Sequence, residues 1–344
     1  MKIETVKGSI KPEELGITLP HEHLISDFTN WFRPPMEASK IPLIDAKINL
    51  GDLSELRRNS SPMKDNLRLL DVGAAIEELK AFKVMGGNSL VELTLPGVGR
   101  DILALRRISE YTGINIIAAT GWYIGTTHPP IVKQKSMEEL AEIIIHELVE
   151  GIDGTGMKAG IIGELGCSHP LQPDEKKVLQ AAANAQKETK ACINVHPSVQ
   201  QRNGQLYLDL IEKEGGNLEK VILSHMDSYS KDEMPSLGMD LDYPRELLQR
   251  GATIEYDWFG RFQGIRTPTD RERIAAIVEL CNQGYEEQIL ISNDVHHKIH
   301  LTRYSGQGYA YILKYIIPAL KDVGITHKQI RKILVENPKR LLSF

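Results

Sequence analysis

Eight short apolar runs alternate along this chain with longer segments of helical periodicity, and this alternation limits the fold more than any other feature. The predicted strands occupy residues 17–24, 88–95, 115–122, 159–167, 192–197, 221–227, 252–260 and 288–294. The predicted helices that follow them occupy residues 71–85, 100–113, 136–152, 173–190, 204–216, 242–251, 269–284 and 308–324. Runs such as GIIGEL and QILIS are almost continuously apolar, as expected for parallel strands covered on both faces. The pattern predicts an α/β fold, a (β/α)8 TIM barrel, with an open doubly wound sheet as the competing arrangement.

Three segments lie outside this repeat. Residues 25–70 form a long polar insertion after the first strand, with four prolines, and we expect it to lie over the barrel mouth. Residues 261–269 are expected to form a second lid element. Residues 325–344 add an extra C-terminal helix, with Thr326 as its N-cap and a break at Pro338. Because no linker is visible, we predict one barrel domain over residues 1–344.

Composition excludes several classes of partner. The 344 residues carry a formal net charge of −5, which gives no basic footprint for nucleic acid. No run approaches the roughly 18 apolar residues that a membrane helix needs. The three cysteines show no paired spacing, and the N-terminus lacks the apolar core of a signal peptide. We therefore expect a cytoplasmic protein that contacts neither nucleic acid nor membrane.

Six side chains that can bind metal stand near the ends of the predicted strands: His21, His23, Glu164, His196, His225 and Asp294. On a strand, positions i and i+2 project to the same face, so His21 and His23 can share one ion. The C-terminal ends of barrel strands converge, which would bring all six together. Taken singly, the histidines could instead be core residues bonded to backbone carbonyls. The buried carboxylates need partners, however, and one metal cluster would satisfy all six groups.

The motifs PHEHL, GELGCS, VHPS, LSHMD and SNDVHHK resemble the phosphotriesterase family of the amidohydrolase superfamily, in its phosphotriesterase-related branch. The resemblance covers essentially the whole chain. It implies two divalent metal ions, one held by His21, His23, Glu164 and Asp294, the other by Glu164, His196 and His225. Many members carry a carbamylated lysine where this chain has Glu164, so the resemblance implies a glutamate bridge here. Nitrogen and oxygen ligands fit zinc, with manganese, cobalt or iron as alternatives.

The resemblance also implies the activity. We expect a binuclear metal-dependent hydrolase that cleaves ester, lactone or related bonds with a metal-bridging hydroxide, with side activity on phosphoesters. Asp294 would be the catalytic residue that takes the proton of the nucleophile. The alternative is an amidase for small N-acyl amino acids or other anionic amides. A remoter alternative, from another class, is a non-catalytic binding protein stabilised by its metals.

Four residues are candidates for contacting a small-molecule substrate: Tyr123, Trp258, Arg261 and Arg303. Tyr123 corresponds to a family tyrosine near the metal pair. Trp258 stands where lactonase members have an arginine, which argues against simple transfer of that activity. The basic residues of the last two loops favour an anionic substrate. A homodimer is a further expectation.

Overall fold

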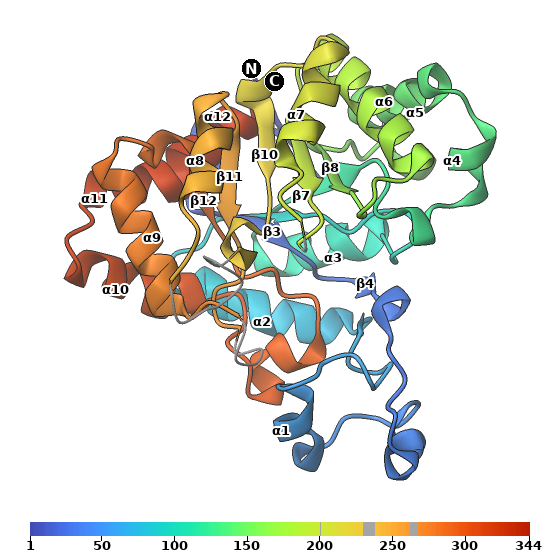
Figure 1. Ribbon diagram of the computed structural model, residues 1–344, viewed down its shortest axis with the longest axis vertical. Coiled ribbons are helices and arrows are strands. Elements are labelled where there is room, and N and C mark those ends of the chain that lie inside the picture. Colours follow the sequence, from blue (N-terminus) through green and yellow to red (C-terminus); the bar gives the residue numbers. More distant parts are fainter. Residues whose placement is uncertain (200, 230–237, 262–266) are drawn as a thin grey trace.

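The computed structural model describes residues 1–199, 201–229, 238–261 and 267–344, and its centre is a sheet of eight parallel strands (Figure 1). In spatial order the strands are β3 (Thr18–Glu22), β6 (Ser89–Glu92), β7 (Asn115–Thr120), β8 (Ile161–Gly166), β9 (Ile193–His196), β10 (Val221–Leu223), β11 (Thr253–Tyr256) and β12 (Ile289–Ile291). Each pairs in parallel with its successor along the chain. Every strand predicted from the sequence is present.

Hydrogen bonds beyond the end of β12 close this sheet into a barrel. The Asp294 N–H donates to the carbonyl of His21 at 3.2 Å, and the His23 N–H donates to the carbonyl of Val295 at 3.3 Å. The Ser292 hydroxyl oxygen also lies 2.8 Å from the His21 carbonyl oxygen. These bonds join the last strand to the first. The TIM barrel is confirmed, and the open doubly wound sheet is wrong.

Helices cover the outside of the barrel and follow its strands along the chain. They are α2 (Val72–Val84), α3 (Ile102–Thr112), α4 (Pro130–Gln134), α5 (Met137–Val149), α6 (Pro173–Thr189), α7 (Gly204–Lys213), α8 (Asp242–Gln249), α9 (Asp270–Asn282) and α10 (Ile317–Asp322). The side chains of Asp71, Asp101, Ser136 and Thr269 accept hydrogen bonds from backbone N–H groups at the starts of α2, α3, α5 and α9. Among the described residues, no helix has the length and apolar character to span a membrane.

The extra C-terminal helix is present, but the predicted break at Pro338 is not. Thr326 caps α11 (His327–Arg331), which continues through a π-helical turn, η15 (Lys332–Glu336), directly into α12 (Asn337–Leu342). Proline lacks an N–H, and in an α-helix its ring crowds the carbonyl four residues earlier. The wider π turn just before Pro338 relieves this conflict. Pro318 follows another π-helical turn, η14 (Ile312–Ile316), in the same way.

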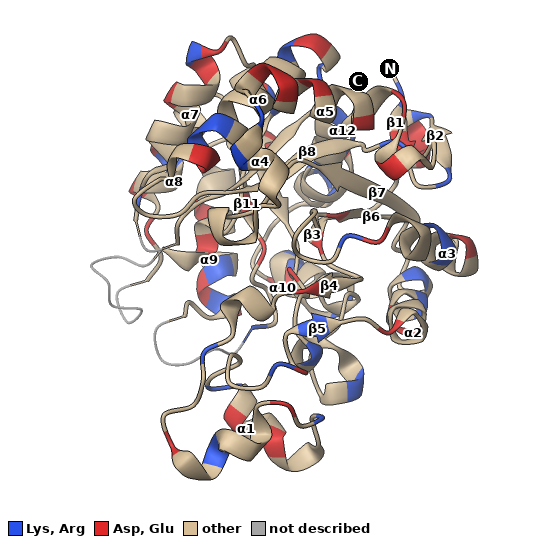
Figure 2. Cartoon of the chain, turned by 90° about the vertical axis from the view of Figure 1, so that its right-hand side faces the viewer, with Lys and Arg blue, Asp and Glu red and all other residues tan. Residues whose placement is uncertain are grey.

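The insertion after the first strand folds around a small core of its own. It contains the strands β4 (Ser26–Asp27) and β5 (Arg68–Leu69) and the short helix α1 (Leu53–Leu56). Leu53, Leu56 and Met63 pack on Ile299 from the loop after β12. Figures 1 and 2 show this lobe at the opposite end of the molecule from the chain termini. Only part of the insertion lies over the barrel mouth, where it covers one side.

The two chain ends meet on the far side of the barrel. Lys2 and Phe344 exchange two backbone hydrogen bonds of 3.1 Å each. The hairpin of β1 (Ile3–Thr5) and β2 (Gly8–Ile10) precedes the barrel and was not predicted from the sequence. Of the second predicted lid element, residues 262–266 lie outside the described residues.

Candidate active site

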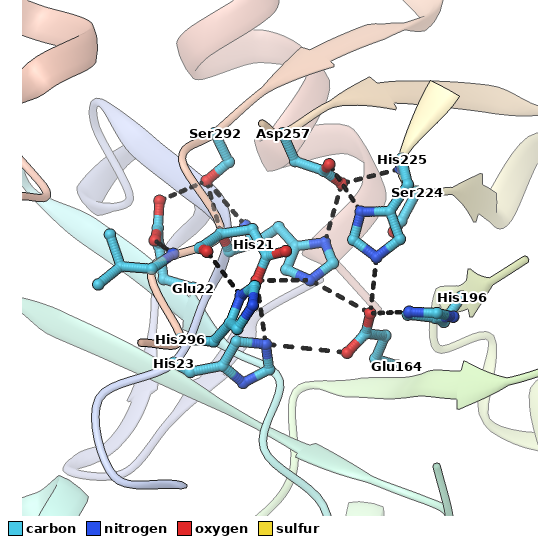
Figure 3. Close-up of polar contacts among 12 residues, drawn as sticks. His21, Glu22, His23, Glu164, His196, Ser224, His225, Asp257, Ser292 and His296 are labelled. Carbon is cyan, nitrogen blue, oxygen red and sulfur yellow. Dashed lines mark hydrogen bonds and ion pairs between the residues drawn. The ribbon is translucent and has the colours of Figure 1, made fainter. Parts of the chain in front are cut away.

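The six predicted ligands converge at the C-terminal ends of the barrel strands. Figure 3 labels five of them: His21, His23, Glu164, His196 and His225. They come from five strands or the residues just beyond them: β3, β8, β9, β10 and β12. The side chain of His196 is 14% exposed, and those of the other five are at most 5% exposed. Residues up to 273 positions apart in the sequence therefore share one buried volume.

Glu164 lies at the centre of this cluster. Its Oε1 atom is 3.1 Å from His225 Nε2, 3.4 Å from His21 Nε2 and 3.8 Å from His196 Nε2. Its Oε2 atom is 3.8 Å from His23 Nε2. Asp294 Oδ1 approaches the same His23 nitrogen at 3.3 Å. One carboxylate thus faces four imidazoles, three through Oε1 and one through Oε2.

Acceptors behind the histidine rings fix which ring nitrogen carries the proton. His225 Nδ1 lies 2.7 Å from Asp257 Oδ1, and His21 Nδ1 lies 3.1 Å from Asp257 Oδ2 and 3.2 Å from Glu255 Oε2. Because an ionised carboxylate only accepts hydrogen bonds, both Nδ1 atoms must donate. Each Nε2 faces Glu164 and would offer a lone pair to a cation bound there. This is the arrangement in which a carboxylate orients a metal-binding imidazole.

His23 is oriented by a relay of neutral and acidic groups. The Thr94 hydroxyl donates to Glu92 Oε1 at 2.7 Å, so its oxygen accepts from His23 Nδ1 at 2.9 Å. The Nε2 of His23 therefore also faces the cluster. Sequence reasoning missed Glu92, Glu255 and Asp257 as functional residues. Their signal was an acidic residue within or just after an otherwise apolar strand.

Glu22, between the two histidines of β3, points the other way. It accepts hydrogen bonds from the Ser292 hydroxyl at 2.8 Å and from the backbone N–H groups of Asn293 and Val295, both at 2.8 Å. Burial raises the pKa of Glu22 to about 7, although these hydrogen bonds oppose the shift. Its contacts hold the segment that carries Asp294 against β3.

The electrostatics of the cluster favour positive charge at its centre. Burial acts to lower the pKa of His225, but Asp257 and Glu164 raise it to about 10. Burial likewise opposes the charged form of His21, yet Glu164, Asp294 and Asp257 hold its pKa well above the usual value. His196 has fewer acidic neighbours, and burial lowers its pKa to about 4. The same carboxylates would stabilise a bound cation.

The backbone around the cluster adopts conformations that side chains rarely permit. His225 and Asp294 have φ values of 58° and 48°, in the left-handed region. Gly163, just before Glu164, has φ of 111°, and a Cβ there would lie 2.0 Å from the carbonyl oxygen of Asn194. Only glycine fits this approach between β8 and β9. Such strain clusters at functional sites because the surrounding fold must enforce it.

A cavity of about 290 Å³ opens above the cluster, and the insertion supplies one of its walls. This volume is at the small end of the roughly 300–1,000 Å³ typical of ligand pockets. Its lining beyond the six predicted ligands, of which it includes all but His21, consists of Phe28, Trp31, Arg33, Ser61, Tyr123, Val199, Trp258, Arg261, His296 and His297. Sequence reasoning missed the contribution of the insertion. Its signal was the aromatic and basic run TNWFR within an otherwise polar segment.

Three of the four predicted substrate residues line this cavity. The Tyr123 hydroxyl lies 3.0 Å from His196 Nε2, and the Trp258 ring lies 5.6 Å from the His225 ring. Arg261 pairs with the Asp294 carboxylate and donates to the Asp294 carbonyl at 2.7 Å. The Arg261 guanidinium is therefore already bound to Asp294 within the site.

Arg303 is the predicted substrate residue that the structure does not bring to the cavity. It contacts Asp71 Oδ2 at 3.2 Å and lies over the Tyr304 ring, with its side chain 52% exposed. It lines a separate small depression beside α2. The loop after β12 turns away from the barrel mouth between His297 and Arg303. The short sequence distance from Asp294 to Arg303 did not reveal this turn.

The donor set fits divalent cations. His21 Nε2 is fully buried and has no hydrogen-bond partner among the described residues, although it faces two carboxylates. One potential ligand atom from each of His21, His23 and Glu164 falls within 4.8 Å of the others, and the same holds for Glu164, His196 and His225. These two groups share Glu164. Imidazole nitrogens with carboxylate oxygens are a ligand set that zinc and similar metals accept.

Comparison with known proteins gives a consistent result along the whole chain. A family description for the phosphotriesterase family matches residues 1–342. An N-acetyltaurine hydrolase from Xenopus tropicalis is 39% identical over 351 residues, covering 100% of this chain and 98% of the relative. An N-acetyltaurine hydrolase from Homo sapiens is 38% identical over 355 residues, with the same coverage.

Solved structures show the same similarity. A resiniferatoxin-binding protein from Rhodobacter sphaeroides superposes with a TM-score of 0.93 at 38% identity, covering 99% of this chain and 95% of the other. A lactonase from Listeria monocytogenes superposes with a TM-score of 0.79 at 27% identity, covering 100% and 99%. The similarity to the N-acetyltaurine hydrolases and to the Rhodobacter protein is therefore greater than the similarity to this lactonase.

Proposed function

This chain belongs to the phosphotriesterase family, and on that premise we propose that it hydrolyses small anionic N-acyl amides, such as N-acetyltaurine and N-acyl amino acids. It is a hydrolytic enzyme of that family, and the proposal concerns its substrate. The observation that carries it is the 36–39% identity to N-acetyltaurine hydrolases over 100% of this chain. Sequence reasoning placed esters and lactones first and amides second. The lower identity to the lactonase, 27%, favours reversing that order.

The proposed enzyme holds two divalent cations. His21, His23, Glu164 and Asp294 would bind one, and Glu164, His196 and His225 would bind the other. Support comes from the shared Glu164 and from the Nε2 atoms that face it. When bound, the cations would supply a Lewis acid for the substrate carbonyl and lower the pKa of a water molecule. Zinc remains our expectation, with manganese, cobalt or iron as alternatives.

Asp294 would accept and then donate the proton that is transferred in the reaction. In amide hydrolysis, water adds to the acyl carbon, the C–N bond breaks, and the departing nitrogen must receive a proton. Asp294 lines the cavity, and its Oδ1 atom faces His23 and His296 at 3.3 Å and 3.0 Å. Arg261 binds its other oxygen and would hold the carboxylate in place. The proton would pass through Asp294 from the attacking water to the leaving amine.

Arg33 would recognise the anionic end of the substrate. It lies in the cavity wall formed by the insertion and contacts the backbone carbonyl of Phe32 at 3.0 Å. No carboxylate among the described residues forms an ion pair with it. The other lining arginine, Arg261, is already paired with Asp294. A guanidinium without an acidic partner can bind a sulfonate or carboxylate through two parallel hydrogen bonds.

A parallel assay tests the proposed substrate class. Purified protein would be given N-acetyltaurine, N-acetyl amino acids, N-ethylacetamide as an uncharged amide, lactones, aryl esters and a phosphotriester. We expect kcat/KM for the anionic amides to exceed that for every other class by more than about tenfold, or roughly 1.4 kcal/mol. A preference for lactones or esters would restore the first expectation from sequence. The absence of any turnover would favour the binding-protein alternative.

The homodimer and the cytoplasmic location remain predictions. Size-exclusion chromatography with light scattering would test the first.

A further inference from the structure

Three histidines in the loop after β12 form a second imidazole cluster beside the candidate active site. The ring centroids of His296 and His297 are 4.1 Å apart, and that of His300 lies 5.0 Å and 5.1 Å from them. One nitrogen from each ring lies within 4.8 Å of the other two. None of the three belongs to the ligand sets proposed above. Figure 3 labels His296 near His23, at the edge of the central cluster.

The free nitrogens of this cluster are buried without partners. Both ring nitrogens of His297, and Nε2 of His300, have no hydrogen-bond partner within the part of the chain that the structure describes. His297 is 5% exposed. Burying an unsatisfied polar group is unfavourable, so three such atoms in one place carry a large energetic penalty. A metal ion would take the lone pair of one His297 nitrogen and so remove part of this penalty.

The other nitrogens of the cluster are already used in a way that suits such a ligand. His296 Nδ1 lies 3.0 Å from Asp294 Oδ1 and 2.9 Å from the Asp294 carbonyl, so it can donate to either. Its Nε2 then carries only a lone pair. The backbone N–H of His296 approaches His300 Nδ1 at 3.4 Å, so Nδ1 is the His300 nitrogen that carries a lone pair and could bind a metal. A carboxylate that orients one histidine is the usual support of a metal ligand.

Charge at the site does not prevent cation binding. A cationic side chain contacts the cluster: the Nη2 atom of Arg261 lies 3.0 Å from His296 Nδ1. Its charge is balanced by the carboxylate of Asp294, with which it pairs. The cation would therefore bind three neutral imidazoles next to the Arg261–Asp294 ion pair, whose charges cancel.

We propose that His296, His297 and His300 bind a third transition-metal ion, separate from the two central cations. An all-imidazole set selects zinc, copper or nickel over magnesium and calcium, which prefer oxygen ligands. His297 lines the cavity, so the fourth position would be open to water from that side. The neighbouring Ile299 packs into the core of the insertion. The ion would therefore fix the loop after β12 against the lobe that forms the cavity wall.

Wild-type protein provides the decisive test. Crystals soaked in zinc would be examined by anomalous scattering, and a peak about 2.1 Å from one nitrogen of each ring is expected. Metal-free protein would also be titrated with zinc by calorimetry. Absence of the peak overturns the proposal. A Kd above about 100 µM would mean an adventitious ion only and overturns it as well.

Variants separate this ion from the central pair. His297→Gln and His300→Gln should each bind one zinc ion fewer than the wild type, whereas His146→Gln, on the exposed face of α5, should bind the same number. Glu164→Gln should lose zinc from the centre and keep it at the three histidines. Wild-type stoichiometry in both His297→Gln and His300→Gln would contradict the third site. If zinc did not bind at the two central sites in these titrations, the difference between wild type and the His297 and His300 variants would still test the third site.

Discussion

On the floor of the cavity the candidate ligands are buried and braced from behind, whereas the wall formed by the insertion is exposed and bonded mainly to itself. His225 and His21 share the carboxylate of Asp257, which is fully buried. Within the described part of the chain, the Arg33 guanidinium donates only to backbone carbonyls of its own segment, at 3.0 Å and 3.5 Å, and it lies over the Trp31 ring. In barrel enzymes the strand ends hold the chemistry and the loops determine what enters. Changes to the floor should therefore abolish turnover, and changes to the wall should alter substrate preference.

The largest effect is expected at Glu164. Glu164→Gln replaces the shared carboxylate by a neutral amide that bridges two cations poorly, so both central sites should empty. Turnover should fall by about 1,000-fold or more, in the range seen when a preorganised electrostatic group is lost. Metal analysis and the amide assay would measure this. Glu138→Gln, on the exposed first turn of α5, is the control and should behave as wild type.

Activity of the wild type should also be independent of added bicarbonate, because a glutamate bridge needs no carbamate. A strict bicarbonate requirement would contradict the role given to Glu164.

Gly163→Ala should disturb the floor through its backbone. The added Cβ would lie 2.0 Å from the Asn194 carbonyl oxygen, so β8 or β9 must move. We expect a loss of about 3 kcal/mol or more in the free energy of unfolding, which urea denaturation would measure. Gly8 is a matched control, because its φ of 112° is nearly the same but nothing lies within 4 Å of its Cβ position. Equal losses in both variants would show that conformational strain, and not the close approach, requires glycine at position 163.

Asp257→Asn tests the bracing of the floor without touching a ligand. The amide can no longer accept from both His21 and His225 as a charged group, so their tautomers are less well fixed. Loss of such a supporting carboxylate typically weakens metal binding by about 10–100-fold. Competition with a chelator would measure the affinity. Asp270→Asn, which removes a carboxylate bonded to Arg273 away from the cavity, should lower stability while leaving that affinity unchanged.

The smallest effect is expected in the wall. Arg33→Met should lower kcat/KM for N-acetyltaurine by about tenfold, since a charge-assisted hydrogen bond contributes about 1.5–3 kcal/mol before exposure weakens it. Turnover of the uncharged N-ethylacetamide should be unchanged. Arg303→Met is the matched control, because Arg303 also lies over a neighbouring aromatic ring but outside the cavity. An equal loss of kcat/KM with both substrates would show that Arg33 supports the folding of the lobe and does not recognise the anionic group.

Much of the barrel could be predicted because its signals are local. Apolar runs with flanking helices marked all eight strands, and the histidines and acids at their ends marked the cluster. Glu92, Glu255 and Asp257, which orient the histidine rings, were harder to predict, because a single acidic residue in an apolar strand does not reveal its partner. Pro338 was misinterpreted because a π-helical turn has no simple sequence signature.

By itself, the sequence determined the fold class, the family resemblance and the convergence of the six candidate ligands, because side-chain period and strand order follow from local pattern. Only the tertiary structure decided which loop residues reach the cavity. Arg33 enters the wall and Arg303 does not, although Arg303 is nearer in sequence to a candidate ligand. The difference arises because loop direction depends on packing between distant segments, here Leu53, Leu56 and Met63 against Ile299. Such packing is a property of the folded chain, and no local stretch of residues encodes it.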